Sequence, residues 1–285
     1  MRLCRFQTAQ GLTRVGLTYD GNTVLDMTSA GVERLDQLLE AENFTTHLAR
    51  LVNQTQTRHG LRNLRLLPPV EQQEVWAAGV TYLRSKKARM EESNFSANAY
   101  DQVYEAARPE LFFKSSPEKV VGPGDALGIR KDANWNVPEP ELALVINSKG
   151  HIVGYTIGND MSSRDIEGEN LLYLPQAKVY ARSCALGPFI TVDVLEAEAR
   201  TWAIHMRVQR DTHVIFQGDT SVGQIKRRFD DLVAYLFRCQ TFPHGAILLT
   251  GTGIVPPDQF TLQAGDNVQI SINGMGTLEN SVVVV

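Results

Sequence analysis

A pair of glutamates at the start of an apolar strand most constrains the fold of this chain. Glu139 and Glu141 stand two positions apart, and the segment Leu142–Ile146 that follows is entirely apolar. Side chains at positions i and i+2 of a strand point to the same face, so we expect both carboxylates on one face, beside a segment that favours burial. Two like charges in a low-dielectric site repel, and they need shared protons, a cationic partner or a metal.

A second acidic element follows the next apolar run. Ile152–Ile157 leads into Asn159 and Asp160, so a third carboxylate is expected beside the first two. Three oxygen donors from two adjacent strands suit Mg²⁺ or Mn²⁺, with positions left for water and substrate. The alternative is a solvated strand end, which an acidic pair often is. The nearby Arg164 and Lys178 favour the metal site.

Composition limits the partners of the chain. Its 285 residues suffice for one large domain or for one domain with a small companion. A net charge of −4 and the lack of a long basic run argue against a nucleic-acid partner. No apolar run approaches membrane-spanning length and no signal-peptide pattern opens the sequence, so we expect a cytoplasmic protein without membrane association. Cys4, Cys184 and Cys239 are widely spaced and indicate reduced thiols.

The pattern predicts a mostly β (α+β) protein in two parts. Residues 1–70 are expected to form a small N-terminal α/β domain that ends at Pro68-Pro69, and residues 71–285 a catalytic domain. Ser221–Phe237 is the best amphipathic helix, and Ser85–Ser93 is charged and partly helical. The expected strands of the larger part are Val75–Val80, Glu110–Lys114, Ala126–Ile129, Glu141–Ile146, Ile152–Ile157, Leu186–Val192, Trp202–Gln209, His213–Gln217 and Asn267–Ile272.

Several motifs occur in the order typical of one enzyme family. They are Phe112-Phe113-Lys114, Glu139-Pro140-Glu141, Asn159-Asp160-Met161-Ser162-Ser163-Arg164-Asp165, Lys178 and Thr250-Gly251-Thr252-Gly253. Together they make residues 70–285 resemble the fumarylacetoacetate hydrolase family. The resemblance implies a rolled, mixed β-sheet core, a homodimer and a 2-oxo acid substrate.

The same resemblance implies roles for individual residues. Glu139, Glu141 and Asp160 would hold a divalent cation, usually Mg²⁺ with Mn²⁺ as an option, Lys178 would stand beside it, and Thr252 would contact the substrate carboxylate. A metal chelated by a 2-oxo acid withdraws electrons from the keto carbon and stabilises an enolate.

The residues themselves leave several of these roles open. Lys178 could act as a base, as an acid or as an anchor for the substrate. Its apolar neighbours in the sequence argue against a lysine on the surface. Arg164 either anchors a carboxylate or pairs with an acidic neighbour, and the Thr252 loop is either a carboxylate site or a plain turn.

One segment departs from the hydrolases of the family. Those enzymes carry Asn-Tyr, a histidine three residues later and a glutamate three beyond that, whereas this chain has Thr81-Tyr82, Ser85 and Ala88. The missing His/Glu pair argues against hydrolysis. We expect Arg84 and Ser85 to contact the substrate instead. The charged segment Leu83–Asn98, with few apolar anchors, is expected to act as a lid that opens at low free-energy cost.

A second feature resembles the sugar-acid dehydratase branch, which converts 2-keto-3-deoxypentonates to 2,5-dioxopentanoate. Glu110 begins an apolar strand, and in that branch a glutamate at this position faces the substrate. A buried carboxyl with a raised pKa could protonate the departing carbon-4 hydroxyl. The alternative for Glu110 is a solvated strand-end residue.

The sequence therefore predicts a Mg²⁺-dependent lyase that dehydrates a 2-keto-3-deoxy sugar acid. The enzymatic alternative is a C–C hydrolase or decarboxylase of a 2,4-diketo or 2-oxo acid, with Glu91 or Glu92 replacing the missing pair. The non-catalytic alternative is a small-molecule binding protein on a degenerate scaffold, which a full ligand set with Lys178 disfavours.

Overall fold

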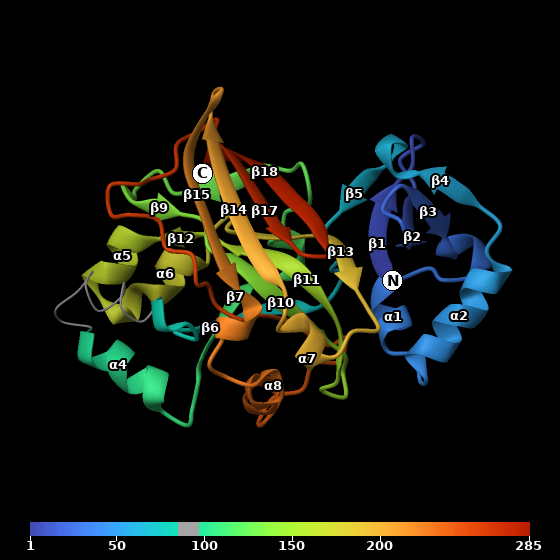
Figure 1. Cartoon of the computed structure of the whole chain (residues 1–285), viewed down its shortest axis with the longest axis horizontal. Coiled ribbons are helices and arrows are strands. Elements are labelled where there is room, and N and C mark those ends of the chain that lie inside the picture. Colours follow the sequence, from blue (N-terminus) through green and yellow to red (C-terminus); the bar gives the residue numbers. More distant parts are fainter. Residues whose placement is uncertain (85–96) are drawn as a thin grey trace.

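The computed structural model describes residues 1–84 and 97–285, and most of its strands belong to two sheets (Figure 1). The expected helical segment Ser85–Ser93 and most of the expected lid lie outside the described residues. A two-stranded ribbon, β9 (Asn136–Val137) with β12 (Ser162–Ser163), lies beside the sheets. The expectation of a sheet-rich α+β fold is confirmed.

The larger sheet has the strand order β4-β3-β2-β1-β13-β11-β10-β16-β6-β7, and β5 also pairs with β1. Its pairings are antiparallel except for β16 with β6, which makes the sheet mixed. The strands are β1 (Arg2–Gln7), β2 (Thr13–Thr18), β3 (Thr23–Asp26), β4 (Arg58–Gly60), β5 (Arg65–Leu67), β6 (Glu74–Gly79), β7 (Glu110–Ser115), β10 (Pro140–Ile146), β11 (Ile152–Asp160), β13 (Cys184–Thr191) and β16 (Ala246–Leu249).

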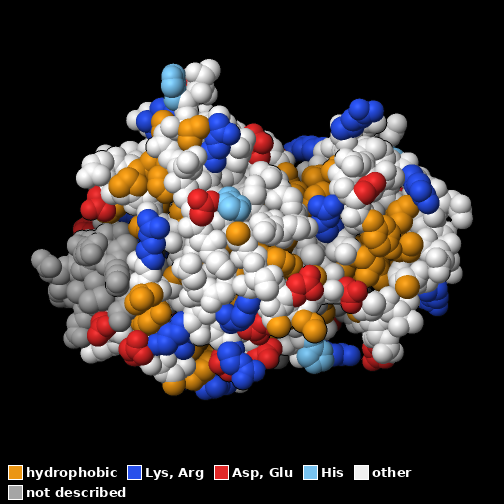
Figure 2. All heavy atoms as spheres, viewed as in Figure 1, with side chains coloured by type: hydrophobic (Ala, Val, Ile, Leu, Met, Phe, Trp, Pro, Cys, Tyr) orange, Lys and Arg blue, Asp and Glu red, His pale blue; other side chains and the backbone are white. Residues whose placement is uncertain are grey.

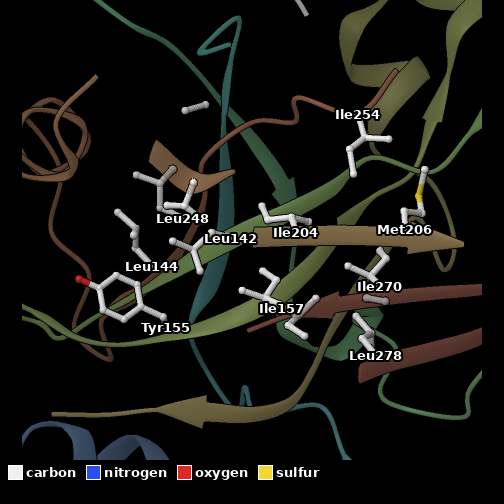
Figure 3. Close-up of a cluster of buried hydrophobic side chains, with 14 of the residues drawn as sticks. Leu142, Leu144, Tyr155, Ile157, Ile204, Met206, Leu248, Ile254, Ile270 and Leu278 are labelled. Atoms are coloured by element: carbon white, nitrogen blue, oxygen red, sulfur yellow. The ribbon is translucent and has the colours of Figure 1, made fainter. Parts of the chain in front are cut away.

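The smaller sheet packs against the centre of the larger one. Its order is β15-β14-β17-β18-β8, from β15 (His213–Ser221), β14 (Ala203–Arg210), β17 (Asn267–Ile272), β18 (Gly276–Val284) and β8 (Leu127–Ile129). Figure 3 shows Leu142 and Ile157 of the large sheet among Ile204, Ile270 and Leu278 of the small one. The core between the sheets thus holds β10 and β11 in place.

Strand β10 is buried on both faces, which explains its uninterrupted apolar sequence. Leu142 and Leu144 belong to the core between the sheets, whereas Ala143 and Val145 belong to a second core on the opposite face. A strand covered on both sides reads as a continuous apolar run rather than an alternating one.

Short helices cover the sheets and fill their connections. They are α1 (Leu35–Leu39), α2 (Phe44–Gln54), α4 (Ala97–Glu105), α5 (Arg164–Glu169), α6 (Leu174–Lys178), α7 (Glu196–Ala199) and α8 (Phe229–Leu236). Single 3₁₀ turns are η1 (Met27–Ala30), η2 (Leu61–Asn63), η3 (Pro117–Lys119), η4 (Leu171–Tyr173) and η5 (Val222–Gln224). No helix of the described chain is long and apolar enough to cross a membrane.

The expected helix Ser221–Phe237 is wrong in its first half. Residue Ser221 ends β15, a single 3₁₀ turn follows, and α8 begins only at Phe229. The amide of Lys226 donates to the carbonyl of Thr81 at 3.0 Å, and the Arg227 side chain donates to carbonyls near the end of α4. These tertiary contacts hold the segment extended where its amphipathic pattern favoured a helix.

The N-terminal residues extend the large sheet at one end (Figure 1). Strand β1 pairs with β13 through Arg2 with Thr191 and Leu3 with Ile190. The second core joins apolar side chains of α1 and α2 to those of β10, β13 and β16. The division of the chain at about residue 70 stays a prediction. Figure 2 shows charges of both signs interspersed on this face of the molecule.

Candidate active site

Three carboxylates meet where β10 begins and β11 ends. Glu139 precedes β10, Glu141 is its second residue, and Asp160 is the last residue of β11, which pairs with β10. One ligand atom of each lies within 4.8 Å of the others. All three side chains are buried, and all three line one pocket. The antiparallel pairing of two apolar strands thus collects the acidic groups at one end.

A cationic side chain or a backbone amide contacts one oxygen of each carboxylate. Three contacts do this: Arg164 Nη2 to Glu139 Oε1 at 2.8 Å, the Gly251 amide to Glu141 Oε2 at 2.6 Å, and Lys114 Nζ to Asp160 Oδ1 at 2.5 Å. Lys178 Nζ lies 2.7 Å from Glu139 Oε2 and 2.9 Å from Asp160 Oδ2. The triad is therefore oriented and partly neutralised by its surroundings.

The donor set fits a small divalent cation. Burial, together with the charges of Asp160 and Glu139, raises the pKa of Glu141 well above its usual value. Carboxylates crowded in this way are stabilised by a cation among them, and oxygen-only ligands suit Mg²⁺ or Mn²⁺. The residues of the site therefore suit the divalent cation that the sequence analysis predicted.

Lys178 is a buried residue of the pocket and not a surface lysine. It ends the short helix α6, only 2% of it is exposed, and its Nζ also donates to Ser162 Oγ at 2.6 Å. The ring of Phe112 lies 5.7 Å from the same nitrogen. The ammonium is thus fixed between two carboxylates, a hydroxyl and an aromatic face, on the wall of the pocket.

Glu110 lines the same pocket from β7, the strand at the edge of the large sheet. It is the first residue of β7 and lies opposite Gly79 of β6. Both residues line the pocket, as does Val80, whose positive φ of 53° is rare for a β-branched residue. Such strained positions tend to cluster at functional sites.

The loop after β16 contributes Gly251 and Thr252 to the same pocket. Strand β16 lies between β10 and β6, so its end points at the carboxylates. Gly251 has a φ of 90°, which favours glycine, and its amide reaches Glu141. Thr252 lines the pocket, and its hydroxyl contacts the backbone of Ile254. Its expected contact with a substrate carboxylate stays a prediction.

Three further residues were predicted to contact the substrate: Arg164, Arg84 and Ser85. Arg164 is buried and pairs with Glu139, as one of the two expectations for it required. Its expected contact with a substrate carboxylate stays a prediction. Arg84 is exposed, and its guanidinium donates to the carbonyl of Val255 at 3.4 Å. Ser85, with Ala88, Glu91 and Glu92, lies outside the described residues.

Two buried charged residues of the site were not predicted from the sequence. Lys114 is completely buried behind Asp160, although its position at the end of an apolar strand was a usable signal. Glu167 is 5% exposed and lines the pocket from α5, one helical turn after Arg164. That three-residue spacing places both on one helix face.

Comparison with known proteins identifies close relatives. Residues 74–283 match the fumarylacetoacetate hydrolase C-terminal family. The probable 2-keto-3-deoxyxylonate dehydratase of Haloferax volcanii is 51% identical over 217 residues, which are 76% of this chain and 74% of the relative. The 2-dehydro-3-deoxy-D-arabinonate dehydratase of Saccharolobus solfataricus is 40% identical over 221 residues, again 76% and 74%.

The fold of one solved structure matches that of this chain over its full length. A 2-keto-3-deoxy-D-arabinonate dehydratase complexed with magnesium and 2,5-dioxopentanoate superposes with a TM-score of 0.84 at 32% identity, covering 100% of this chain and 99% of that one. The family match, the relatives and the shared fold lead to one conclusion: the chain belongs to the fumarylacetoacetate hydrolase family.

Proposed function

We propose that this protein is a Mg²⁺-dependent hydro-lyase that converts a 2-keto-3-deoxypentonate to 2,5-dioxopentanoate with loss of water. The observation that carries the proposal is the single pocket that the carboxylate triad, Lys178 and Glu110 all line. The two dehydratase relatives and the structure solved with magnesium and 2,5-dioxopentanoate support the same chemistry.

The pocket supplies the groups that dehydration needs. Glu139, Glu141 and Asp160 would hold the cation, which when bound supplies Lewis-acid polarisation of the keto group. Lys178, made neutral by its burial and by a cation bound nearby, removes a proton from carbon 3, and Glu110 gives a proton to the hydroxyl leaving carbon 4. The resulting 5-hydroxy-2-oxopent-3-enoate loses a proton from carbon 5 and gains one at carbon 3. The enol formed in this way then loses its hydroxyl proton and gains one at carbon 4, which gives 2,5-dioxopentanoate.

The substrate carboxylate has a candidate partner in the loop after β16. Thr252 presents a hydroxyl and a backbone amide beside Gly251, a shape that suits an anion. Arg84 and Ser85 are proposed to contact the more distant hydroxyls of the sugar acid.

The product of the reaction tests the proposal. Purified protein is incubated with 2-keto-3-deoxypentonates and, separately, with 2,4-diketo acids, each with Mg²⁺ and with chelator. We expect 2,5-dioxopentanoate from a pentonate, only when Mg²⁺ is present. If the pentonates are untouched while a 2,4-diketo acid is split into pyruvate and a second acid, the protein is a hydrolase instead.

We also infer a homodimer located in the cytoplasm. The family resemblance supports the dimer, and the three widely spaced cysteines, which indicate reduced thiols, support the location. Light scattering coupled to size-exclusion chromatography tests the first inference. A mass of one 31.7 kDa chain at micromolar concentration would contradict it.

A further inference from the structure

We propose that Lys114 is a positioning residue that makes Asp160 present a single oxygen to the cation, so that the site prefers Mg²⁺ over Ca²⁺. The inference deepens the proposed function and rests on its cation site. It concerns a residue of the chain that touches no substrate in the mechanism above.

The contacts of Lys114 join three parts of the site. This residue lies near the end of β7 and is completely buried. Its Nζ forms an ion pair with Asp160 Oδ1 at 2.5 Å and donates to the carbonyls of Met161 at 2.9 Å and Lys178 at 2.5 Å. One ammonium thus ties strand β7 to the end of β11 and the end of α6.

This arrangement fixes the direction of the Asp160 carboxylate. With Oδ1 held by Lys114, the other oxygen, Oδ2, faces Lys178 Nζ at 2.9 Å. Lys114 also holds the backbone of Lys178, so one residue positions both members of that pair. Residues that hold a metal ligand without touching the metal commonly change metal affinity by about 10- to 100-fold when they are removed.

The other two carboxylates are held in the same manner. Glu139 Oε1 contacts Arg164 and Glu141 Oε2 contacts the Gly251 amide. Each of the three has one oxygen engaged by these groups. The second oxygens of Glu139 and Asp160 meet at Lys178 Nζ, so a cation bound beside that ammonium would be ligated by these oxygens, one from each carboxylate. Mg²⁺ accepts an octahedral shell of single oxygens, whereas Ca²⁺ takes more ligands and often uses both oxygens of a carboxylate.

Replacing Lys114 by Met tests the inference, because Met has a similar length and no donor. Dissociation constants for Mg²⁺ and for Ca²⁺ are measured by calorimetry on the full chain without substrate. We expect the preference for Mg²⁺ over Ca²⁺ to fall by about tenfold or more, since Asp160 Oδ1 becomes available to the larger ion. An unchanged preference in a folded Lys114→Met protein would overturn the inference.

Arg210→Met is the control for the loss of an ion pair to a buried aspartate. Arg210 contacts both carboxylate oxygens of the fully buried Asp266, at 2.7 and 2.8 Å, in the smaller sheet. Its removal should lower stability without changing the preference between the two ions. If Arg210→Met shifts that preference as much as Lys114→Met does, the effect is general destabilisation and the inference is wrong.

Two further measurements keep the test decisive. Lys114→Gln retains one donor group and should shift the preference in the same direction by a smaller factor. The wild-type protein should bind Mg²⁺ roughly tenfold more tightly than Ca²⁺ or better, and equal affinities would contradict the inference even if neither variant folds. Because substrate is absent throughout, a failure of the dehydration assay overturns the proposed function without affecting this result.

Discussion

The carboxylate of Glu110 lies directly over the α-carbon of Gly79, its cross-strand neighbour in the β6–β7 pair. A β-carbon at position 79 would overlap Glu110 Oε2, because that oxygen occupies the space a side chain would need. The backbone of Gly79 does not adopt a left-handed conformation, so space and not conformation requires glycine here. Gly79 therefore sets where the proposed acid stands.

Gly79→Ala should lower turnover while leaving the fold intact. The methyl group displaces the end of a flexible side chain, so the free energy of unfolding should change by less than about 1 kcal/mol. The turnover number should fall at least about tenfold, because the displaced carboxyl no longer reaches the leaving hydroxyl. Denaturant titration and steady-state kinetics measure the two quantities.

Gly60→Ala provides the control for Gly79→Ala. Gly60 ends β4, and a β-carbon there would meet only Asn63 at 3.5 Å. This variant should match wild type in turnover. Equal turnover in Gly79→Ala and wild type would show that the position of Glu110 is unimportant.

Glu110→Gln should lower the turnover number by roughly 100-fold or more, as expected when a general acid is lost. Its affinity for Mg²⁺ should stay close to that of wild type, because Glu110 is not one of the three clustered ligands. Kinetics and calorimetry on the same preparation check both statements. A variant that loses metal affinity in proportion to turnover would place Glu110 among the ligands instead.

Glu141→Gln should weaken Mg²⁺ binding far more than it lowers stability. Burial and the charges of Asp160 and Glu139 raise the pKa of Glu141, so its ionised form is unfavourable in the chelator-treated protein. A neutral amide relieves that repulsion and can still accept from the Gly251 amide. The free energy of unfolding in chelator should therefore equal or exceed that of wild type. A large loss of stability in chelator would contradict this explanation.

Two of the three cysteines should be unreactive in the folded protein. Burial raises the pKa of Cys4 and of Cys184 to about 12, from a usual 9.0, whereas Cys239 is exposed. At pH 8, an aromatic disulfide reagent should label one thiol per native chain and three after denaturation, because only the thiolate reacts. Labelling of two or three thiols in the native chain at the rate seen for unfolded protein would contradict the assignment.

The same thiols predict a stability change at alkaline pH. Between about pH 9 and pH 12 the folded chain retains two protons that the unfolded chain releases, so the free energy of unfolding should decrease as pH rises through this range. The contribution is fully present below pH 9. A Cys4→Ala, Cys184→Ala double variant should show a smaller decrease.

The sequence predicted the parts of the site that depend on local order. The i, i+2 spacing placed Glu139 and Glu141 on one face, and the apolar runs predicted the strands that bring Asp160 beside them. Asn267–Ile272 is a strand with the predicted bounds. The family resemblance, and not spacing, supplied Lys178 and Glu110 as site residues.

Other features of the fold and the site could not be predicted from the local sequence pattern, because contacts between residues far apart in the sequence determine them. Lys114 is buried by its contacts with Asp160 and Lys178, both more than 40 positions away. The segment before Phe229 is extended because the Lys226 amide contacts Thr81. Strand β1 begins one residue after Met1 and pairs with β13, a partner about 190 positions distant that no local signal identifies.

The pairing of β1 with β13 also bears on the solubility of the chain. Strand β13 already pairs with β11 along one side, and β1 covers part of its other side through only two residue pairs. An uncovered strand offers unpaired amides and carbonyls to any passing chain, which is a route to aggregation. Strand β1 therefore covers part of the edge of β13. A shortened chain that begins after β1 would expose unpaired backbone amides and carbonyls of β13 and should aggregate more readily.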